Sequence, residues 1–205
     1  GNNLLDLAKA LRGHFLTNNQ QLGDGPPALG WYLNQQNLSK EIDRWVERRQ
    51  QMIKRPFLST LERFINPLNA RIMIASAFHP PYGEKMLTVC ERAGYPGGII
   101  VRNGLEGTMA FSLMRPIKIL CSARQKDGSY VRHEITVSPE DYLDKPVKLE
   151  ERLTEPSLEK NVELIETYQK EGRTSYDLFD ARIKITCAGF KKAIGWVEDN
   201  ISLGR

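Results

Sequence analysis

Three stretches of the sequence carry side chains that could bind a charged substrate, and the first contains Arg55 and Ser59. Ser59-Thr60-Leu61-Glu62 is a capping-box pattern, which predicts that a helix begins at Ser59. A helix N-terminus has free N–H groups and a partial positive charge, and a neighbouring guanidinium offers two donors to a carboxylate or phosphate. Arg55 and Ser59 are therefore candidate substrate-binding residues. The alternative is that Ser59 only caps the helix and Arg55 is solvated.

The second stretch is Phe78-His79-Pro80-Pro81, which joins a predicted strand to a predicted helix. Ligands of open α/β sheets bind beyond the carboxyl ends of the strands, and this position places His79 for contact with a substrate. No serine or cysteine nucleophile motif accompanies His79, so a structural loop histidine is the alternative.

The third stretch, 103–108, follows the next predicted strand in an equivalent position. Asn103 is a candidate substrate contact in this loop. The carboxylate of Glu106 is a candidate ligand for a metal–phosphate complex, or an acceptor for a ligand hydroxyl. A single carboxylate between two glycines fits an ordinary turn equally well, because dedicated metal sites need more oxygen ligands.

The elements that must position His79 and Glu106 form a predicted βαβ unit. It consists of a strand at 71–78, a helix from Pro80 to about Gly94 and a strand at 98–102. Such a unit places its two strands parallel, with a right-handed crossover.

Alternating apolar residues at 117–123 and 130–137, with Asp127-Gly128 between them, predict an antiparallel hairpin. We therefore expect an α/β fold with a mainly parallel sheet, one antiparallel hairpin and flanking helices.

The spacing of apolar residues predicts the remaining elements. They are a helix over 2–16, a strand near 29–33, a helix from Ser39 to about Ile53, and two C-terminal helices after a charged link at 144–157. The first C-terminal helix ends near Gly172. The second begins after Ser175, and its predicted apolar face comprises Tyr176, Phe179, Ile183, Cys187 and Phe190. We expect a lead-in over 1–38 and an α/β domain over 39–205.

Composition excludes several classes of protein. The 205 residues are 40% hydrophobic and 26% charged, as in globular proteins and unlike disordered chains. Three cysteines without a paired motif argue against a disulfide framework or zinc site and favour a reducing, cytoplasmic location. No apolar run is long enough to span a membrane. The net charge of +4 permits nucleic-acid or phosphate partners without demanding them.

Three segments taken in order resemble one family. They are IKRPFLSTLERFINPL (53–68), IASAFHPPYGEKMLTVCERAGYPGGIIVRNGLEGT (74–108) and EGRTSYDLFDARIKITCAG (171–189). Together they are similar to the C-terminal α/β part of anthranilate phosphoribosyltransferase-like proteins of glycosyltransferase family 3. The resemblance implies a phosphoribosyltransferase/nucleoside phosphorylase type domain, a homodimer, and transfer of the phosphoribosyl group of PRPP to anthranilate or a similar aromatic acceptor.

The resemblance also implies roles for individual residues. Arg55 matches an arginine that contacts anthranilate in the family, and Phe78-His79-Pro80 matches its F-H-P turn. The family binds Mg²⁺ through two acidic residues of a G-L-D-E loop. Glu106 stands in the place of one acid, and Gly107 replaces the other.

Two family loops, G-T-G-G-D for pyrophosphate and K-H-G-N-R, occur nowhere in the sequence, and the chain starts at Gly1 without Met. We therefore expect that the chain is the C-terminal portion of a longer protein, without the family's N-terminal helical domain, and that it shows no turnover alone.

The leading alternative is a non-enzymatic nucleic-acid-binding paralogue of the same family. Its basic residues would be Arg44, Arg48, Arg49, Lys54 and Arg55. Acidic residues are interleaved with them, a pattern that is also typical of a solvated helix face. A second alternative is a structural role in which a partner protein supplies the rest of the site.

Overall fold

The computed structural model describes residues 4–11, 14–16, 31–33, 40–51, 64–66, 68–102, 109–143 and 157–202. The chain divides into two compact units, 1–62 with 152–175 and 63–151 with 176–205. The domain boundary predicted between residues 38 and 39 lies outside the described residues, as does 144–156, most of the predicted charged link.

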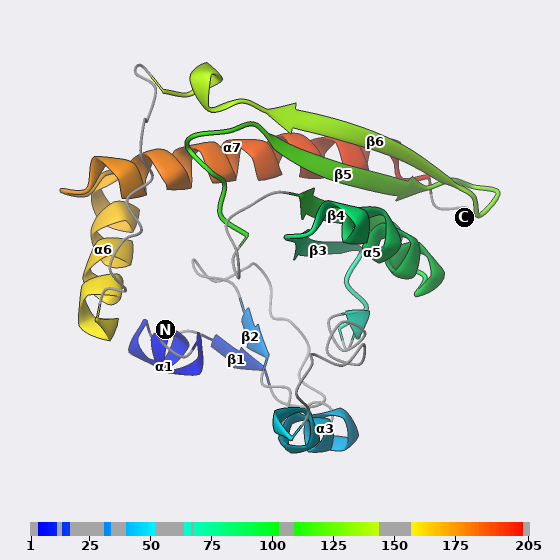
Figure 1. Ribbon diagram of the computed structural model, residues 1–205, viewed down its shortest axis with the longest axis horizontal. Coiled ribbons are helices and arrows are strands. Elements are labelled where there is room, and N and C mark those ends of the chain that lie inside the picture. Colours follow the sequence, from blue (N-terminus) through cyan, green and yellow to red (C-terminus); the bar gives the residue numbers. More distant parts are fainter. Residues whose placement is uncertain are drawn as a thin grey trace. The chain divides into compact units, whose positions relative to one another are not determined.

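The second unit is built on a four-stranded sheet with the order β3-β4-β5-β6 (Figure 1). Its strands are β3 (Ile72–Ala77), β4 (Gly97–Arg102), β5 (Ile117–Arg124) and β6 (Tyr130–Val137). β3 and β4 are parallel and helix α5 (Pro80–Arg92) connects them, which confirms the predicted βαβ unit. β5 and β6 form the predicted antiparallel hairpin.

The sheet is mixed, and the expectation of a mainly parallel sheet is wrong for the described strands. β4 pairs with β5 in the antiparallel sense, so only one of the sheet's three pairings is parallel. A parallel pairing requires a crossover, usually a helix. The described residues between β4 and β5, 109–116, contain no helix.

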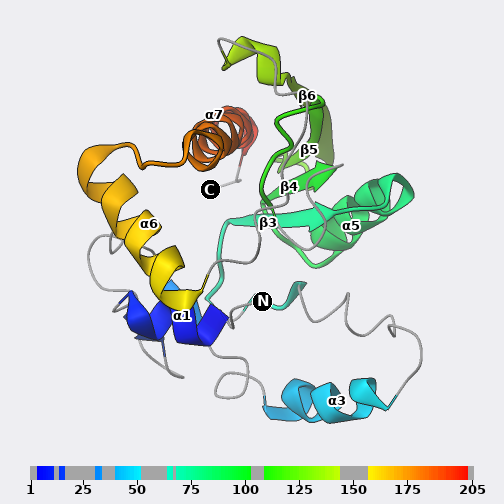
Figure 2. The same cartoon turned by 60° about the vertical axis from the view of Figure 1, so that its left-hand side comes forward.

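The sheet lies between two helices, with α5 on one face and α7 (Asp177–Asn200) on the other (Figure 2). The side chains of β4 alternate between these faces. Ile99 and Val101 belong to the core against α7, whereas Ile100 belongs to the core against α5. All three are fully buried, and full burial of such a side chain contributes about 1.5–3 kcal/mol to stability.

The buried face of α7 agrees with the predicted one only in part: Phe190 packs against the core, with its ring centroid 5.5 Å from that of Phe111. Its fully enclosed residues are Ile185, Gly189, Ala193 and Val197. Cys187 is exposed, and Tyr176 is an exposed residue that precedes the helix. The enclosed residues were missed because two of them, Gly189 and Ala193, carry little hydrophobic signal.

The described part of the first unit contains three helices, α1 (Leu4–Ala10), α3 (Lys40–Gln50) and α6 (Leu158–Glu171), and a parallel pair of short strands. The strand pair is β1 (His14–Leu16) with β2 (Trp31–Leu33), so the short strand predicted near 29–33 is present. The Ser157 hydroxyl accepts a hydrogen bond from the Lys160 N–H, and Gly172 adopts φ 71° after α6, as expected for its caps.

The helix predicted over 2–16 is shorter in the structure. Helix α1 covers Leu4–Ala10, and His14–Leu16 is the strand that pairs with Trp31–Leu33. This pairing with a distant segment overrides the local helical periodicity. The helix predicted from Ser59 lies largely outside the described residues.

Among the described residues, no helix is both long and apolar enough to cross a bilayer.

Candidate functional site

The candidate site lies at the carboxyl ends of β3 and β4, where helix α5 begins (Figure 1). Ala77 and Arg102, the last residues of the two strands, are register partners. His79 follows β3 at this end and is exposed. The parallel pairing therefore brings His79 and Arg102 to the same edge of the sheet, where open α/β sheets bind ligands.

The two prolines that follow His79 determine the direction of the backbone at this residue. His79 has φ −84° and ψ 121°, the extended conformation that a following proline favours. Pro80 and Pro81 then start α5, where their fixed φ suits the first helical turn. The His79 side chain makes no capping hydrogen bond, so it is not used to stabilise the start of the helix.

Aromatic rings gather around His79. Its ring packs edge-on against Phe78 with centroids 5.2 Å apart, and the Tyr82 ring lies 6.2 Å away. Phe78 and Tyr82 are 42% and 54% exposed, and the Lys85 ammonium lies 5.7 Å from the Tyr82 ring centroid. The group offers exposed apolar ring surface beside a cation, a combination suited to a planar ligand with negative charge.

The site extends across the sheet from β4 to β6 through a row of charged residues, one on each strand. The Arg102 guanidinium lies 3.4 Å from the Glu134 carboxylate, and the Lys118 ammonium lies 2.6 Å from the same carboxylate. Arg102 and Lys118 are register partners on β4 and β5. None of these three residues was predicted from the sequence as part of the site. The alternation of apolar and polar residues along the hairpin strands does mark Lys118 and Glu134 as polar positions.

Arg55, Ser59, Asn103 and Glu106 lie outside the described residues. The structure thus describes one of the five, His79, and adds Arg102, Lys118 and Glu134 at the same edge.

No group of three metal-ligating side chains occurs within the described parts of the chain. Glu106, the residue that the resemblance assigns to Mg²⁺, lies beyond those parts.

The cysteines that are buried in the second unit are unsuited to nucleophilic chemistry. Burial raises the pKa of the Cys90 and Cys121 thiols from 9.0 to about 12. The thiolate is the reactive form of cysteine, so both remain protonated and inert near neutral pH. Cys187 is exposed on α7.

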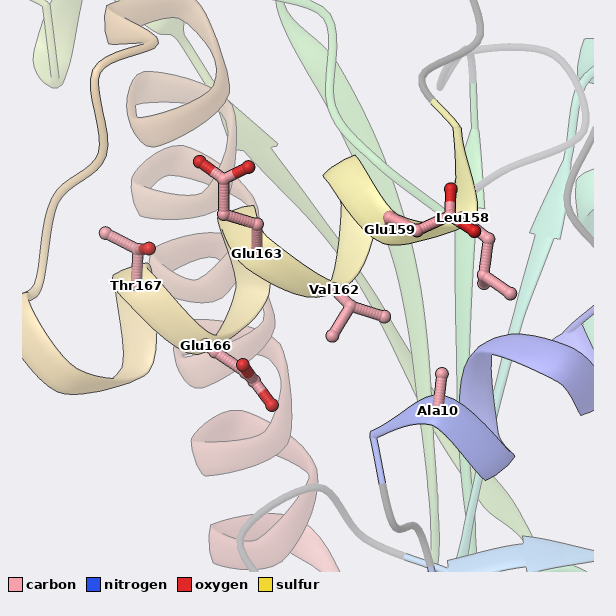
Figure 3. Close-up of a pocket in the computed structure, with 7 residues that line it drawn as sticks. All are labelled: Ala10, Leu158, Glu159, Val162, Glu163, Glu166 and Thr167. Carbon is pink, nitrogen blue, oxygen red and sulfur yellow. The ribbon is translucent and has the colours of Figure 1, made fainter.

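A groove of about 420 Å³ lies in the first unit, between the end of α1 and one side of α6 (Figure 3). The side chains of Ala10, Leu158 and Val162 point toward one another and form its apolar part. Glu163, on its rim, is already paired with Lys160 at 2.7 Å. His79, the predicted site residue that the structure describes, is not among the residues that line this groove.

No family model matches the sequence. Over 173 residues, the chain is 26% identical to an uncharacterized protein of Aquifex aeolicus (strain VF5). The aligned region covers 82% of this chain and 53% of that protein, so the chain spans about half the length of this relative.

Proposed function

We propose that the chain is the C-terminal α/β part of a phosphoribosyltransferase-type protein, which transfers the phosphoribosyl group of PRPP to anthranilate or a similar aromatic acceptor. The observation that carries the proposal is the position of His79, exposed at the carboxyl end of β3 beside the parallel strand β4. The F-H-P turn of the resembled family is the sequence feature at this position.

The proposed reaction is a substitution at the anomeric carbon of ribose. The acceptor nitrogen forms a bond to that carbon and loses a proton, while the bond to pyrophosphate breaks and pyrophosphate leaves with the electron pair. Such a reaction depends mainly on positioning the reactants and stabilising the leaving charge. Rings beside His79 would hold the acceptor, and Mg²⁺ near Glu106 would accompany the phosphates. Two copies of the protein would form a homodimer, as in the resembled family.

Calorimetric titration of this chain with anthranilate, and separately with PRPP plus Mg²⁺, tests the proposal. We expect His79→Ala to weaken binding of the acceptor roughly tenfold, the loss typical of one good contact. His133→Ala removes another exposed histidine, on β6, and serves as the matched control. Absence of anthranilate binding to the folded chain would count against the proposed function, whereas absence of PRPP binding is the result expected of a chain without the family's pyrophosphate loop.

A nucleic-acid-binding function is the second candidate, and one observation on α3 favours it. The Arg48 guanidinium lies 5.1 Å from the ring centroid of Trp45, which is 39% exposed. Exposed aromatic rings with arginine partners can stack on bases. Arg44 is also exposed on this helix, but so is Glu41.

Fluorescence anisotropy with short duplex and single-stranded DNA tests the second candidate. Binding through α3 should weaken steeply with salt, because phosphate contacts release counterions. Arg44→Glu combined with Arg48→Glu should abolish it. Affinity that is independent of salt, or unchanged in this variant, would exclude α3 as the interface.

A further inference from the structure

Arg102 lies across the first turns of α5 in a space that Gly83 leaves open. A Cβ atom at Gly83 would lie 2.9 Å from both Cγ and Cδ of Arg102 and 3.1 Å from Leu120. Any larger residue at position 83 would therefore displace the arginine stem. The side chain of Arg102 is only 20% exposed, so its direction is set by packing as well as by charge.

The polar partners of Arg102 leave much of its donor capacity unused. Among the described residues its one ion pair is the 3.4 Å contact with Glu134, and that carboxylate is shared with Lys118 at the shorter distance of 2.6 Å. The buried Nε of Arg102 donates no hydrogen bond to any of the described residues. Two cations thus share one carboxylate, and this row of three side chains carries one excess positive charge.

A purely structural role does not explain this arrangement well. Ion pairs with partly exposed carboxylates contribute about 0–1 kcal/mol, and Glu134 is 36% exposed. A buried N–H without an acceptor is destabilising. A guanidinium whose stem is held by packing, and whose terminal Nη1 has only a 3.4 Å contact with a shared carboxylate, is instead the state expected of a residue that awaits a ligand.

An anion bound at the start of α5 would need a side-chain cation, because this end of the helix has few free backbone N–H groups. Helix N-termini usually bind anions through free backbone N–H groups. Pro80 and Pro81 have no N–H, and the Tyr82 N–H already donates to the His79 carbonyl at 3.0 Å. The helix therefore offers few donors, and Arg102 is placed to supply them.

We propose that Arg102 binds an oxyanion, a phosphate or a carboxylate group of the ligand, at the carboxyl end of β4. Gly83 provides the space in which its side chain is packed, and the Glu134 carboxylate occupies its guanidinium until the ligand replaces it. The inference rests on the proposed function, because the substrates of that reaction carry both kinds of group.

Calorimetric titration of the full chain with pyrophosphate and with benzoate tests the inference and separates the two sources of the anion. We expect binding of one of them, and Arg102→Met should weaken it at least about tenfold, as for loss of a charge-assisted hydrogen bond. Lys126→Met removes a positive charge from the β5–β6 turn, at the other end of these strands, and should change nothing. Binding that survives Arg102→Met, or no binding of either probe by the wild type, overturns the inference.

Two further variants keep the test decisive if Arg102→Met does not fold. Glu134→Gln removes the shared carboxylate, so affinity for the anion should rise several-fold, and a fall would overturn the inference. Gly83→Ala should weaken binding by displacing Arg102.

The results for Arg102 and His79 together separate this inference from the proposed function. If anion binding depends on Arg102 but acceptor binding does not depend on His79, the inference stands and the proposed function is rejected. If acceptor binding depends on His79 but anion binding does not depend on Arg102, only the inference is rejected.

Discussion

Gly189 of α7 lies directly against the ring of Phe111, which is fully buried. A Cβ atom at Gly189 would lie 2.9 Å from Cζ of that ring and closer still to Cε2, with Val137 3.2 Å away. The absence of a side chain at this position is what allows the helix to approach the sheet.

Gly189→Ala should therefore destabilise the protein. Alanine in a helix interior gains about 1 kcal/mol over glycine, but overpacking a closed core costs about 1–3 kcal/mol and should prevail here. Gly195, on the same helix, has nothing within 4 Å of its would-be Cβ, so Gly195→Ala should be neutral or stabilising. Urea denaturation of both variants measures the difference, and equal stability would contradict the close packing.

Alkaline pH should destabilise the second unit through its buried thiols. In the folded state, Cys90 and Cys121 have pKa values raised by burial from 9.0 to about 12. Between these values the unfolded chain loses protons that the folded chain keeps, so the free energy of unfolding should fall as pH rises above about 9. Cys121→Ala should make this fall shallower. A slope between pH 9 and 11 that is identical in the variant and the wild type would show that the thiol is not its source.

Arg132 should couple β6 energetically to α5. Its Nε and Nη2 lie 2.8 Å and 2.6 Å from the two carboxylate oxygens of Glu91, a two-pronged contact that raises the pKa of Arg132. A double-mutant cycle with Arg132→Met and Glu91→Gln should give a coupling of about 0.5–1 kcal/mol, smaller at high salt because the arginine is partly exposed. Additive effects of the two substitutions would mean that the contact contributes nothing.

Ser157→Ala should loosen the first turn of α6. The hydroxyl accepts the Lys160 N–H, and loss of such a cap costs about 1 kcal/mol. Ser138 precedes a short 3-10 helix without making a capping hydrogen bond, so Ser138→Ala is the matched control. Amide exchange at Lys160 should become faster only in the Ser157 variant; unchanged exchange would show that the cap is not formed in solution.

The elements with strong local signals could be predicted from the sequence. The two prolines that begin α5 and Gly94 after it (φ 85°) bounded that helix, and Asp127-Gly128 marked the hairpin turn. The three-residue strand His14–Leu16 could not be predicted, because only its pairing with Trp31–Leu33 stabilises it. The antiparallel pairing of β4 with β5 could not be predicted either, because it depends on how the whole sheet assembles.

The candidate site was only partly predictable for a similar reason. His79 stood out because it follows a strand and precedes a helix. Arg102, Lys118 and Glu134 come from three different strands, and only the register of those strands brings them together. No spacing in the sequence encodes that register.

The charged run on β6 has a consequence for behaviour at high concentration. Within the described sheet, β6 is bonded to β5 alone, so its outer edge could template pairing with another chain. Arg132, His133 and Glu134 occupy consecutive positions at its middle. Side chains with ionisable groups along an edge strand discourage such pairing, because a second strand would have to desolvate them. Arg132, whose ion pair with Glu91 connects β6 to α5, therefore also helps to protect this edge against aggregation.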